Sequence, residues 1–389
     1  MGSKPPLHIY VIAGEPSGDA LGGRLMAALK QQTEGDVSFS GVGGQEMTEQ
    51  GLQSLFPMSD LSVMGIAEVL PQIPKLLRRI SRVVSDVRSL KPDVVVSIDA
   101  PDFSFRVAKR LKNQGIPMVH LVAPTVWAWR PGRAKKVAQF LDHILCLFPF
   151  EPKYFERQGL AASFVGHSII ESPARDAKAK TFRAQHGLKP NTPVLALLPG
   201  SRMGEVTRHL PVFRDTAEIL AAQVPDLSFV CVTTGEVANY VREELARWPI
   251  EIQVIEANEE KYDAMASADV ALAASGTVAL ELAVVGTPTV IGYQVNWLTA
   301  WIGKRLVTAK FASLVNILLE KEVMPEFLVA KFRAELLAPA LFKLLSDPDA
   351  RLQQTQAFGE AVAMLSPAPG LSPSQKMATA ILETIRKKT

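Results

Sequence analysis

The segment from Val270 to Val290 constrains the fold of this chain more than any other. It reads V-A-L-A-A-S-G-T-V-A-L-E-L-A-V-V-G-T-P-T-V. The pattern predicts a buried strand, a tight loop, a short helix that ends near Val285 and a second strand. Gly286 stands where a left-handed helix cap is common. Continuously apolar strands on either side of a helix are typical of a parallel sheet with both faces covered.

The loop of this segment, formed by Ser275, Gly276 and Thr277, has the properties of a phosphate site. It opens a helix, so free backbone N–H groups and the positive end of the helix dipole point to one place. Glu281 follows Thr277 by four residues and shares its helix face, where a carboxylate suits sugar hydroxyls better than phosphate. These groups favour a nucleotide ligand, although an ordinary buried strand–helix unit explains the segment equally well.

Two series of such units follow one another along the chain. In residues 166–189, Ser, Pro, Lys and Ala replace the strand pattern and separate the series. We therefore predict an α/β protein with two doubly wound, Rossmann-like domains that face a cleft. The domains are residues 1–168 and 169–345, followed by a helical tail over residues 346–389 that could return to the first domain. Strands are expected at residues 8–13, 94–98, 117–122, 143–148, 194–198, 227–233, 252–255, 270–273 and 289–292.

Composition excludes several functional classes. The chain has 389 residues, enough for two domains, and its net charge of +3 is too small to predict nucleic-acid binding. Its two cysteines, Cys146 and Cys231, lie in apolar runs and fit a reducing cytoplasm. We recognise neither a signal peptide nor a run of about 18 apolar residues, so no membrane-spanning helix is expected. The histidines lack metal-ligand spacing and no G-x-S-x-G occurs, so neither a metal site nor a serine nucleophile is expected.

Polar residues follow the predicted strands, where ligands bind in open α/β sheets. The loop after residues 8–13 contains Gly14, Glu15, Ser17 and Gly18. It has the strand–loop–helix position of a ligand loop, but it matches neither a dinucleotide fingerprint nor a P-loop. A plain turn with Asp19 capping the next helix explains it nearly as well.

Two carboxylates, Asp99 and Asp102, leave the end of the predicted strand at residues 94–98. A carboxylate at the floor of a cleft is partly desolvated, which raises its proton affinity and suits a general base. Capping by Asp102 or Ser104 explains one of the two acids more readily than both. Asp99 is therefore our candidate base.

Two further strand ends carry arginines. Trp127 and Arg130 lie in P-T-V-W-A-W-R, which could line a sugar or acyl site or could anchor a domain edge. Arg202 ends the run L-P-G-S-R after the strand at residues 194–198. There it could form a bidentate contact to a diphosphate.

Residues 64–83 combine apolar and basic side chains. Pro71 and Pro74 are expected to break or kink a helix unless it begins after them. The mixture fits lying on an anionic membrane or gripping an acyl chain, and it fits equally a helix packed on the sheet with a solvated basic face. The residues that we assign to membrane or acyl contact are Val69, Leu70, Ile73, Leu76, Leu77, Arg78 and Arg79.

Seven short motifs occur in one order: G-E-P-S-G-D, V-M-G-I-A-E-V-L, S-I-D-A-P-D-F, P-T-V-W-A-W-R, V-G-H, L-L-P-G-S-R and A-S-G-T-V-A-L-E. Together they resemble the lipid-A-disaccharide synthase family over most of the chain. The resemblance implies a two-domain GT-B fold and an inverting glycosyltransferase. Such an enzyme would join UDP-2,3-diacylglucosamine to 2,3-diacylglucosamine 1-phosphate, releasing UDP and forming the β-1,6 disaccharide of lipid A.

The resemblance also implies a role for each domain and for the acids of the first. Residues 1–168 would bind the acceptor and carry the catalytic residues, and residues 169–345 would bind the UDP-sugar. Asp99 would remove the proton from the acceptor 6-hydroxyl, and Asp102 would orient Asp99 or the acceptor. Gly14 to Gly18, Trp127 and Arg130 would line the acceptor side.

In the second domain, the resemblance implies a UDP site. Arg202 and the loop from Ser275 to Thr277 would stabilise the charge that develops on UDP as it leaves. Glu281 would hold the ribose hydroxyls. Asn316 falls in a matching motif, S-L-V-N, which places it at the UDP site without a role that the sequence explains.

The expected partners are the two lipid substrates and a membrane surface. The protein would be peripheral on the cytoplasmic face of the inner membrane, and a homodimer is a candidate assembly. No metal or other cofactor is expected if a helix terminus and an arginine neutralise the diphosphate. Two alternatives stay open: another GT-B enzyme such as a UDP-N-acetylglucosamine epimerase, and a non-catalytic protein that binds nucleotides or membranes.

Overall fold

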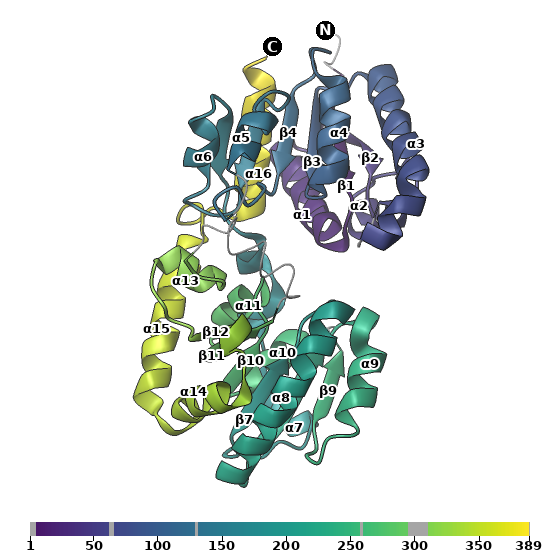
Figure 1. The fold of residues 1–389 in the computed structure, drawn as a ribbon. Helices are drawn as coiled ribbons and strands as arrows, with labels where there is room; N and C mark the ends of the chain where they lie inside the picture. The colour runs from purple at the N-terminus through teal and green to yellow at the C-terminus, as the bar shows by residue number, and fades with distance from the viewer. Residues whose placement is uncertain (1–4, 62–65, 129–130, 257–259, 295–309, 389) are drawn as a thin grey trace. The chain divides into compact units, whose positions relative to one another are not determined.

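The chain folds into two compact units. The computed structural model describes residues 5–61, 66–128, 131–256, 260–294 and 310–388, with side chains described outside residues 66–72 and 236. The first unit is Met1–Ser168 with Leu365–Thr389, and the second unit is Ile169–Met364. Each unit contains a six-stranded parallel sheet with helices packed on it (Figure 1). The predicted class, two doubly wound α/β domains, is confirmed.

A parallel sheet forms the centre of the first unit. Its strands are β1 (Leu7–Ala13), β2 (Val37–Val42), β3 (Val94–Ile98), β4 (Met118–Leu121), β5 (His143–Cys146) and β6 (Ala161–Phe164). Their order across the sheet is β2-β1-β3-β4-β5-β6. β3, β4 and β5 are buried along their whole length, which is why they read as continuous apolar runs.

Helices cover the sheet of the first unit. They are α1 (Pro16–Gln32), α2 (Gln45–Glu49), α3 (Ile66–Leu90), α4 (Pro101–Leu111), α5 (Gly132–Val137), α6 (Pro152–Glu156) and α16 (Pro373–Arg386), with the 3-10 turn η1 (Met58–Asp60). α1 packs against α2 and α16, and α3 packs against α4 (Figure 1). α16, the last helix of the chain, therefore belongs to the first unit.

Two helices of the first unit begin at a proline. α1 begins at Pro16, so Ser17 and Gly18 lie in its first turn and not in a loop. α4 begins at Pro101, which places Asp102 in its first turn. A proline suits the start of a helix because its fixed φ is helical and the N–H that it lacks would have no helical partner there. The loops after β1 and β3 are therefore short.

α3 is continuous through Pro71 and Pro74, so the helix neither breaks at these prolines nor begins after them. Its later turns bury Ile80, Val83 and Val87 in the core of the first unit. Burial of a large apolar side chain contributes about 1.5–3 kcal/mol, and a proline inside a helix costs about 3 kcal/mol. Tertiary packing thus outweighs the two prolines.

Asp19 does not cap the helix in which it lies. Its carboxylate accepts hydrogen bonds from the backbone N–H groups of Gly44 (2.7 Å), Glu46 (3.0 Å) and Met47 (3.2 Å). These are the free N–H groups at the start of α2, so Asp19 caps α2 from within α1. Asp19 was correctly predicted to cap a helix, but the helix that it caps is α2 and not α1.

A second parallel sheet forms the centre of the second unit. Its strands are β7 (Val194–Leu198), β8 (Ser228–Thr233), β9 (Gln253–Glu256), β10 (Val270–Ala273), β11 (Thr289–Tyr293) and β12 (Glu326–Leu328). Their order is β12-β11-β10-β7-β8-β9, so β10, β7 and β8 are neighbours near the middle. Cys231 on β8, like Cys146 on β5, is buried and unpaired.

Helices also cover the sheet of the second unit. They are α7 (Ala179–Gln185), α8 (Met203–Gln223), α9 (Gly235–Leu245), α10 (Lys261–Ser267), α11 (Val278–Val285), α13 (Leu314–Leu319), α14 (Ala334–Ser346) and α15 (Pro348–Met364), with the 3-10 turns η2 (Ser168–Glu171), η3 (Pro173–Asp176) and η4 (Val329–Lys331). Gly286 ends α11 with a φ of 79°, the left-handed cap that its position predicts.

The expected tail over residues 346–389 is divided between the two units. α15 belongs to the second unit, where Gln354 is buried. Its side chain accepts a hydrogen bond from Thr289 N (2.6 Å) and donates to Thr289 O (3.1 Å) and Val323 O (2.8 Å). In the part of the chain that the structure describes, no helix combines the length and apolar content that crossing a membrane requires.

The Gln354 contacts give a test of the fold. We expect Gln354→Leu to lower the free energy of unfolding by about 2–4 kcal/mol, because each buried backbone group left without a partner costs about 1–3 kcal/mol. Gln356→Leu, an exposed position on the same helix, is the matched control and should have an effect near zero. Urea denaturation of the full chain measures both, and equal midpoints would contradict the role of Gln354.

Candidate functional site

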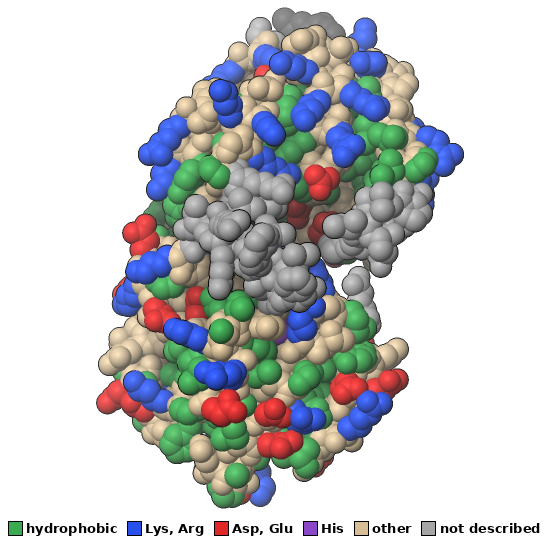
Figure 2. All heavy atoms as spheres, viewed as in Figure 1, with side chains coloured by type: hydrophobic (Ala, Val, Ile, Leu, Met, Phe, Trp, Pro, Cys, Tyr) green, Lys and Arg blue, Asp and Glu red, His purple; other side chains and the backbone are tan. Residues whose placement is uncertain are grey.

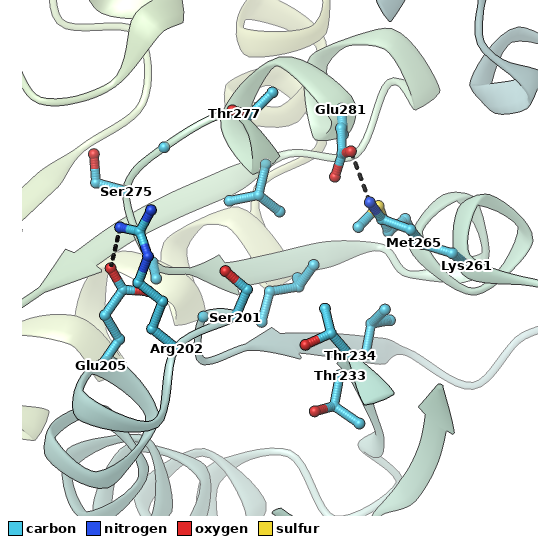
Figure 3. Close-up of a pocket in the computed structure, with 16 residues that line it drawn as sticks. Ser201, Arg202, Glu205, Thr233, Thr234, Lys261, Met265, Ser275, Thr277 and Glu281 are labelled. Atoms are coloured by element: carbon cyan, nitrogen blue, oxygen red, sulfur yellow. Dashed lines mark hydrogen bonds and ion pairs between the residues drawn. The ribbon is translucent and has the colours of Figure 1, made fainter. Parts of the chain in front are cut away.

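The second unit contains a cavity of about 310 Å³ at the carboxyl ends of its central strands. Its walls come from the loops after β7, β8 and β10 and from α10 and α11 (Figure 3). The lining residues are Leu198, Gly200, Ser201, Arg202, Glu205, Val232, Thr233, Thr234, Lys261, Met265, Ala274, Ser275, Gly276, Thr277, Val278 and Glu281. Neighbouring parallel strands end at the same edge of the sheet, so three distant segments meet here.

Two glycines allow the tight loops of this cavity. Gly200 has a φ of 117° and Gly276 a φ of 140°, both in a region that side chains strongly disfavour. Gly276 lies in the loop from Ser275 to Thr277, which we call the Ser275 loop. That loop leads directly into α11, so the N-terminal backbone of the helix borders the cavity.

Charged side chains of both signs line the cavity. The Arg202 side chain is 66% exposed and lies 3.8 Å from Glu205. Glu281 is paired with Lys261, whose Nζ is 2.7 Å from Glu281 Oε1. Figure 3 shows Arg202 and Thr277 on one side of the cavity and Lys261 and Glu281 on another. The structure thus brings together five residues predicted for the nucleotide, Arg202, Ser275, Gly276, Thr277 and Glu281.

Several lining residues were missed by the sequence analysis. Thr233 ends β8 and Thr234 follows it, so the same strand-end rule could have found them. Their Oγ1 atoms are buried and have no hydrogen-bond partner among the described residues. Lys261 lies in α10 and Glu205 in α8, away from any strand end, and nothing in the local sequence marks them as lining residues.

A buried histidine supports the loop that carries Arg202. His209 Nδ1 is 2.7 Å from the carbonyl of Pro199, and its Nε2 accepts a hydrogen bond from Gln294 N at 3.1 Å. Burial lowers the pKa of His209, which keeps the ring neutral and leaves Nε2 free to accept. Tyr293 donates to Glu205 Oε1 at 2.9 Å, which ties the end of β11 to the same wall.

Asn316 does not line the cavity. It is completely buried, and both ends of its amide bond to neighbouring groups of the second unit, Val323, Met324 and Glu326. The structure therefore places it next to the cavity wall and not on it.

In the first unit, Asp99 follows β3 in a strained turn. Asp99 has a φ of 51° and Ala100 a φ of 43°, so two non-glycine residues in succession are left-handed. Each costs about 1–2 kcal/mol, and such strain tends to concentrate at functional sites. Burial raises the pKa of the Asp99 carboxyl, and a hydrogen bond from the Ala100 backbone N–H opposes the rise.

Gly14 is the residue that admits this turn. A Cβ on Gly14 would lie 2.7 Å from the Cβ of Ala100. A Cβ on Gly18 would make only ordinary contacts of 3.5 Å or more. The close approach of the loops after β1 and β3 therefore requires glycine at one of the two predicted positions.

A cavity of about 380 Å³ lies beside this turn, within the first unit. It brings together residues that were predicted for separate roles: Glu15, Asp102 and the apolar side chains of α3. The lining residues are Glu15, Leu61, Ile73, Leu76, Leu77, Ile80, Ala100, Pro101, Asp102, Phe103 and Arg106. It is mainly apolar, with two carboxylates and one arginine, and the side chains of Val69 and Leu70 lie outside the described residues.

The other predicted residues of the first unit have structural contacts. Trp127 donates its indole N–H to the buried Glu151 at 3.1 Å, which fits a domain-edge anchor. Arg79 pairs with Asp60 and stacks over Phe56, so it is part of the fold. Arg78 is exposed, and Arg130 lies outside the described residues.

Among the residues that the structure describes, no three His, Cys, Asp or Glu side chains lie close enough together to hold a metal ion.

Known proteins resemble the chain over nearly its whole length. A family model described as lipid-A-disaccharide synthetase matches residues 9–369. A protein of Rhodospirillum centenum named lipid-A-disaccharide synthase is 50% identical over 385 residues, which cover 98% of this chain and 96% of that protein. One of the same name from Paramagnetospirillum magneticum is 46% identical over 383 residues, covering 97% and 98%.

Solved structures with low sequence identity share the fold. A UDP-GlcNAc 2-epimerase from Neisseria meningitidis, bound to UDP-GlcNAc, matches with a TM-score of 0.63 at 13% identity, covering 98% of this chain and 99% of that chain. MurG from Acinetobacter baumannii matches with a TM-score of 0.58 at 15% identity, covering 98% and 100%. These likenesses span both units, and the expected GT-B fold class is confirmed.

The contact between Gly14 and Ala100 gives a second test. We expect Gly14→Ala to lower the free energy of unfolding by about 1–3 kcal/mol through overpacking. Ala100→Gly removes the opposing Cβ and the left-handed strain, so the double variant should recover most of this loss. Gly132→Ala, where a new Cβ meets no described atom within 4 Å, is the control. A double variant no more stable than Gly14→Ala would contradict this account.

Proposed function

The chain belongs to the lipid-A-disaccharide synthase family and is a glycosyltransferase, and we propose how its two cavities divide the reaction. The donor would be UDP-2,3-diacylglucosamine and the acceptor 2,3-diacylglucosamine 1-phosphate. The transfer would invert the anomeric carbon and release UDP. The observation that carries the proposal is that five residues matched for UDP line one cavity of the second unit, while Glu15 and Asp102 line a cavity of the first unit beside the Asp99 turn.

In this proposal the cavity of the second unit binds UDP. Arg202 and the N–H groups of the Ser275 loop would meet the diphosphate, because both lie at a helix start and the Arg202 side chain is largely exposed. Glu281, held by Lys261, would accept hydrogen bonds from the ribose hydroxyls. The buried hydroxyls of Thr233 and Thr234 would supply partners for the polar edge of uracil.

The first unit would bind the acceptor and start the reaction. Asp99 would take the proton of the acceptor 6-hydroxyl as that oxygen attacks the anomeric carbon of the donor. The bond from that carbon to the diphosphate breaks at the same time, and its electron pair leaves with UDP. The raised pKa of Asp99 suits this step, since a more basic carboxylate accepts a proton more readily. Asp102, at the rim of the adjoining cavity, would orient the acceptor.

No cofactor takes part in this scheme. The charge that appears on the leaving UDP is met by Arg202 and by backbone N–H groups, which are already in place before the reaction. The protein therefore needs no reorganisation of charge at the moment of bond breaking.

The apolar face of α3 would meet the acyl chains and the membrane. Ile73 and Leu77 are each 39% exposed and also line the cavity beside Asp102. The first unit has 23 Lys and Arg against 16 Asp and Glu, whereas the second has 19 against 23. Figure 2 shows Lys and Arg spread over the visible face of the first unit. We propose peripheral binding of this unit to an anionic surface, the cytoplasmic face of the inner membrane.

A crossed pair of variants tests the division of labour. Asp99→Asn should keep the wild-type Kd for UDP and lose about 10²–10⁴-fold in kcat, the usual contribution of a general base. Arg202→Ala should instead weaken UDP binding. Calorimetric titration with UDP and an assay of UDP release from both lipid substrates measure the two effects.

The pH profile provides an independent check. A base works only when deprotonated, so wild-type kcat/KM should fall as the pH drops through the pKa of Asp99, which burial raises above the usual carboxyl range. Asp99→Asn should lack this acid limb. More than about a tenth of the wild-type rate in Asp99→Asn would sink the base assignment.

The membrane proposal has its own test. Ile73→Ser with Leu77→Ser should reduce partitioning into phosphatidylglycerol vesicles by about tenfold, because two apolar contacts with lipid are lost. The Kd for UDP should not change. Leu352→Ser, at a position 55% exposed on α15 of the second unit, is the control and should partition like the wild type. Unchanged partitioning of the double variant would count against the proposal.

A further inference from the structure

We propose that Asn316 and Glu326 are positioning residues for the Ser275 loop, acting through the carbonyl of Ala312 and not by touching the nucleotide. This inference rests on the proposed function, because it assumes that the Ser275 loop meets the diphosphate of UDP. It assigns a role to a residue of the S-L-V-N motif that the sequence could not explain, and it adds Glu326, which no motif marks.

The hydrogen bonds of Asn316 leave nothing to offer a ligand. Its Nδ2 donates to Met324 O at 2.7 Å and to Glu326 Oε1 at 2.8 Å. Its Oδ1 accepts from Val323 N at 2.8 Å and from Met324 N at 2.9 Å. A primary amide has two N–H donors and two good acceptor positions, so all are in use. Direct contact with UDP would require breaking a buried bond.

Glu326 collects three N–H donors. Its Oε1 accepts from Ser313 N at 2.8 Å as well as from Asn316, and its Oε2 accepts from Ala312 N at 2.8 Å. One carboxylate thus holds two successive backbone N–H groups, and Asn316 fixes the carboxylate in turn. Charge-assisted bonds of this kind are stronger than neutral ones, so the backbone at Ala312 is held in one position.

Ala312 passes this constraint to the cavity. Its carbonyl accepts a hydrogen bond from Ser275 Oγ at 2.9 Å. Gly276, the next residue, has no side chain, and a Cβ there would meet no described atom within 4 Å, so packing restrains the loop weakly at this point. The Ser275 hydroxyl is therefore an anchor of the loop, and its N–H groups are free to face the cavity.

The experiment compares four single variants, Glu326→Gln, Asn316→Ala, Ser275→Ala and Ser275→Thr, with one double variant and one control variant. Glu326→Gln keeps the shape but turns an N–H group toward backbone donors. Ser275→Ala removes the anchor, and Ser275→Thr keeps the hydroxyl. Calorimetry would measure the Kd for UDP and for uridine, which lacks the diphosphate. Glu320→Gln is the matched control, because Glu320 is an exposed carboxylate at the C-terminal end of α13.

We expect Glu326→Gln and Ser275→Ala each to raise the Kd for UDP by about tenfold, because each variant loses one hydrogen bond that holds the loop. The Kd for uridine should stay within about twofold of the wild-type value. Ser275→Thr and Glu320→Gln should bind both ligands like the wild type. The double variant Glu326→Gln with Ser275→Ala should lose no more UDP affinity than the single variant with the larger loss. Both substitutions break the same chain of contacts, so their effects should not add. If Glu326→Gln fails to fold, the contrast between Ser275→Ala and Ser275→Thr still decides whether the anchor acts on the diphosphate.

Other results would overturn the inference. Equal losses for UDP and uridine would mean a general structural role. Multiplied losses in the double variant would mean that Glu326 does not act through Ser275. Loss of UDP in Asn316→Ala with normal binding in Glu326→Gln would mean that Asn316 contacts the nucleotide itself. Failure of the wild type to bind UDP would be a failure of the proposed function, and it is seen before any variant is compared.

Discussion

The parallel direction of neighbouring strands is the constraint on which the rest of this structure depends. Because β10, β7 and β8 are neighbours and run the same way, strands that end at Leu198, Thr233 and Ala273, far apart in the sequence, end at one edge of the sheet. The same holds for β1 and β3 in the first unit. Each edge leaves backbone groups without a sheet partner, and there the chain can place groups for a ligand without weakening its core.

What each edge offers differs because the loops differ. In the second unit the loops contain glycines with positive φ, which bring backbone N–H groups to the cavity surface. In the first unit the loop after β3 adopts the same region without glycine, at Asp99 and Ala100. A glycine adopts a positive φ without strain, whereas an aspartate with a positive φ is strained. We infer that the second unit is built to bind an anion and the first to hold a carboxylate in place.

The sequence predicted what local patterning controls. β3 and β7 were placed to the residue, since a strand buried on both faces must be apolar throughout. The Ser275 loop and the cap at Gly286 were also found, because their backbone needs specific residues. Lys261 and the contacts of Asn316 could not be found, since each depends on a partner brought close only by the fold. The helix starts at Pro16 and Pro101 were missed because these prolines were taken as part of the loops after the strands.

Four carboxylates of the structure, Asp19, Asp99, Glu151 and Glu326, differ in the N–H donors that their oxygens accept. Asp19 and Glu326 each accept three N–H donors, and both hold backbone in place. Glu151 also accepts three, from Trp127, Leu147 and Phe148, although burial raises its pKa to about 7. For Asp99, the described donor that opposes the effect of burial is a single backbone N–H. Glu151 shows that three donors do not by themselves keep the pKa of a carboxyl low, because burial outweighs them there. Asp99 differs from the other three carboxylates in its position, because it follows β3 in a strained turn beside a cavity, and that position is what the proposed role of general base depends on.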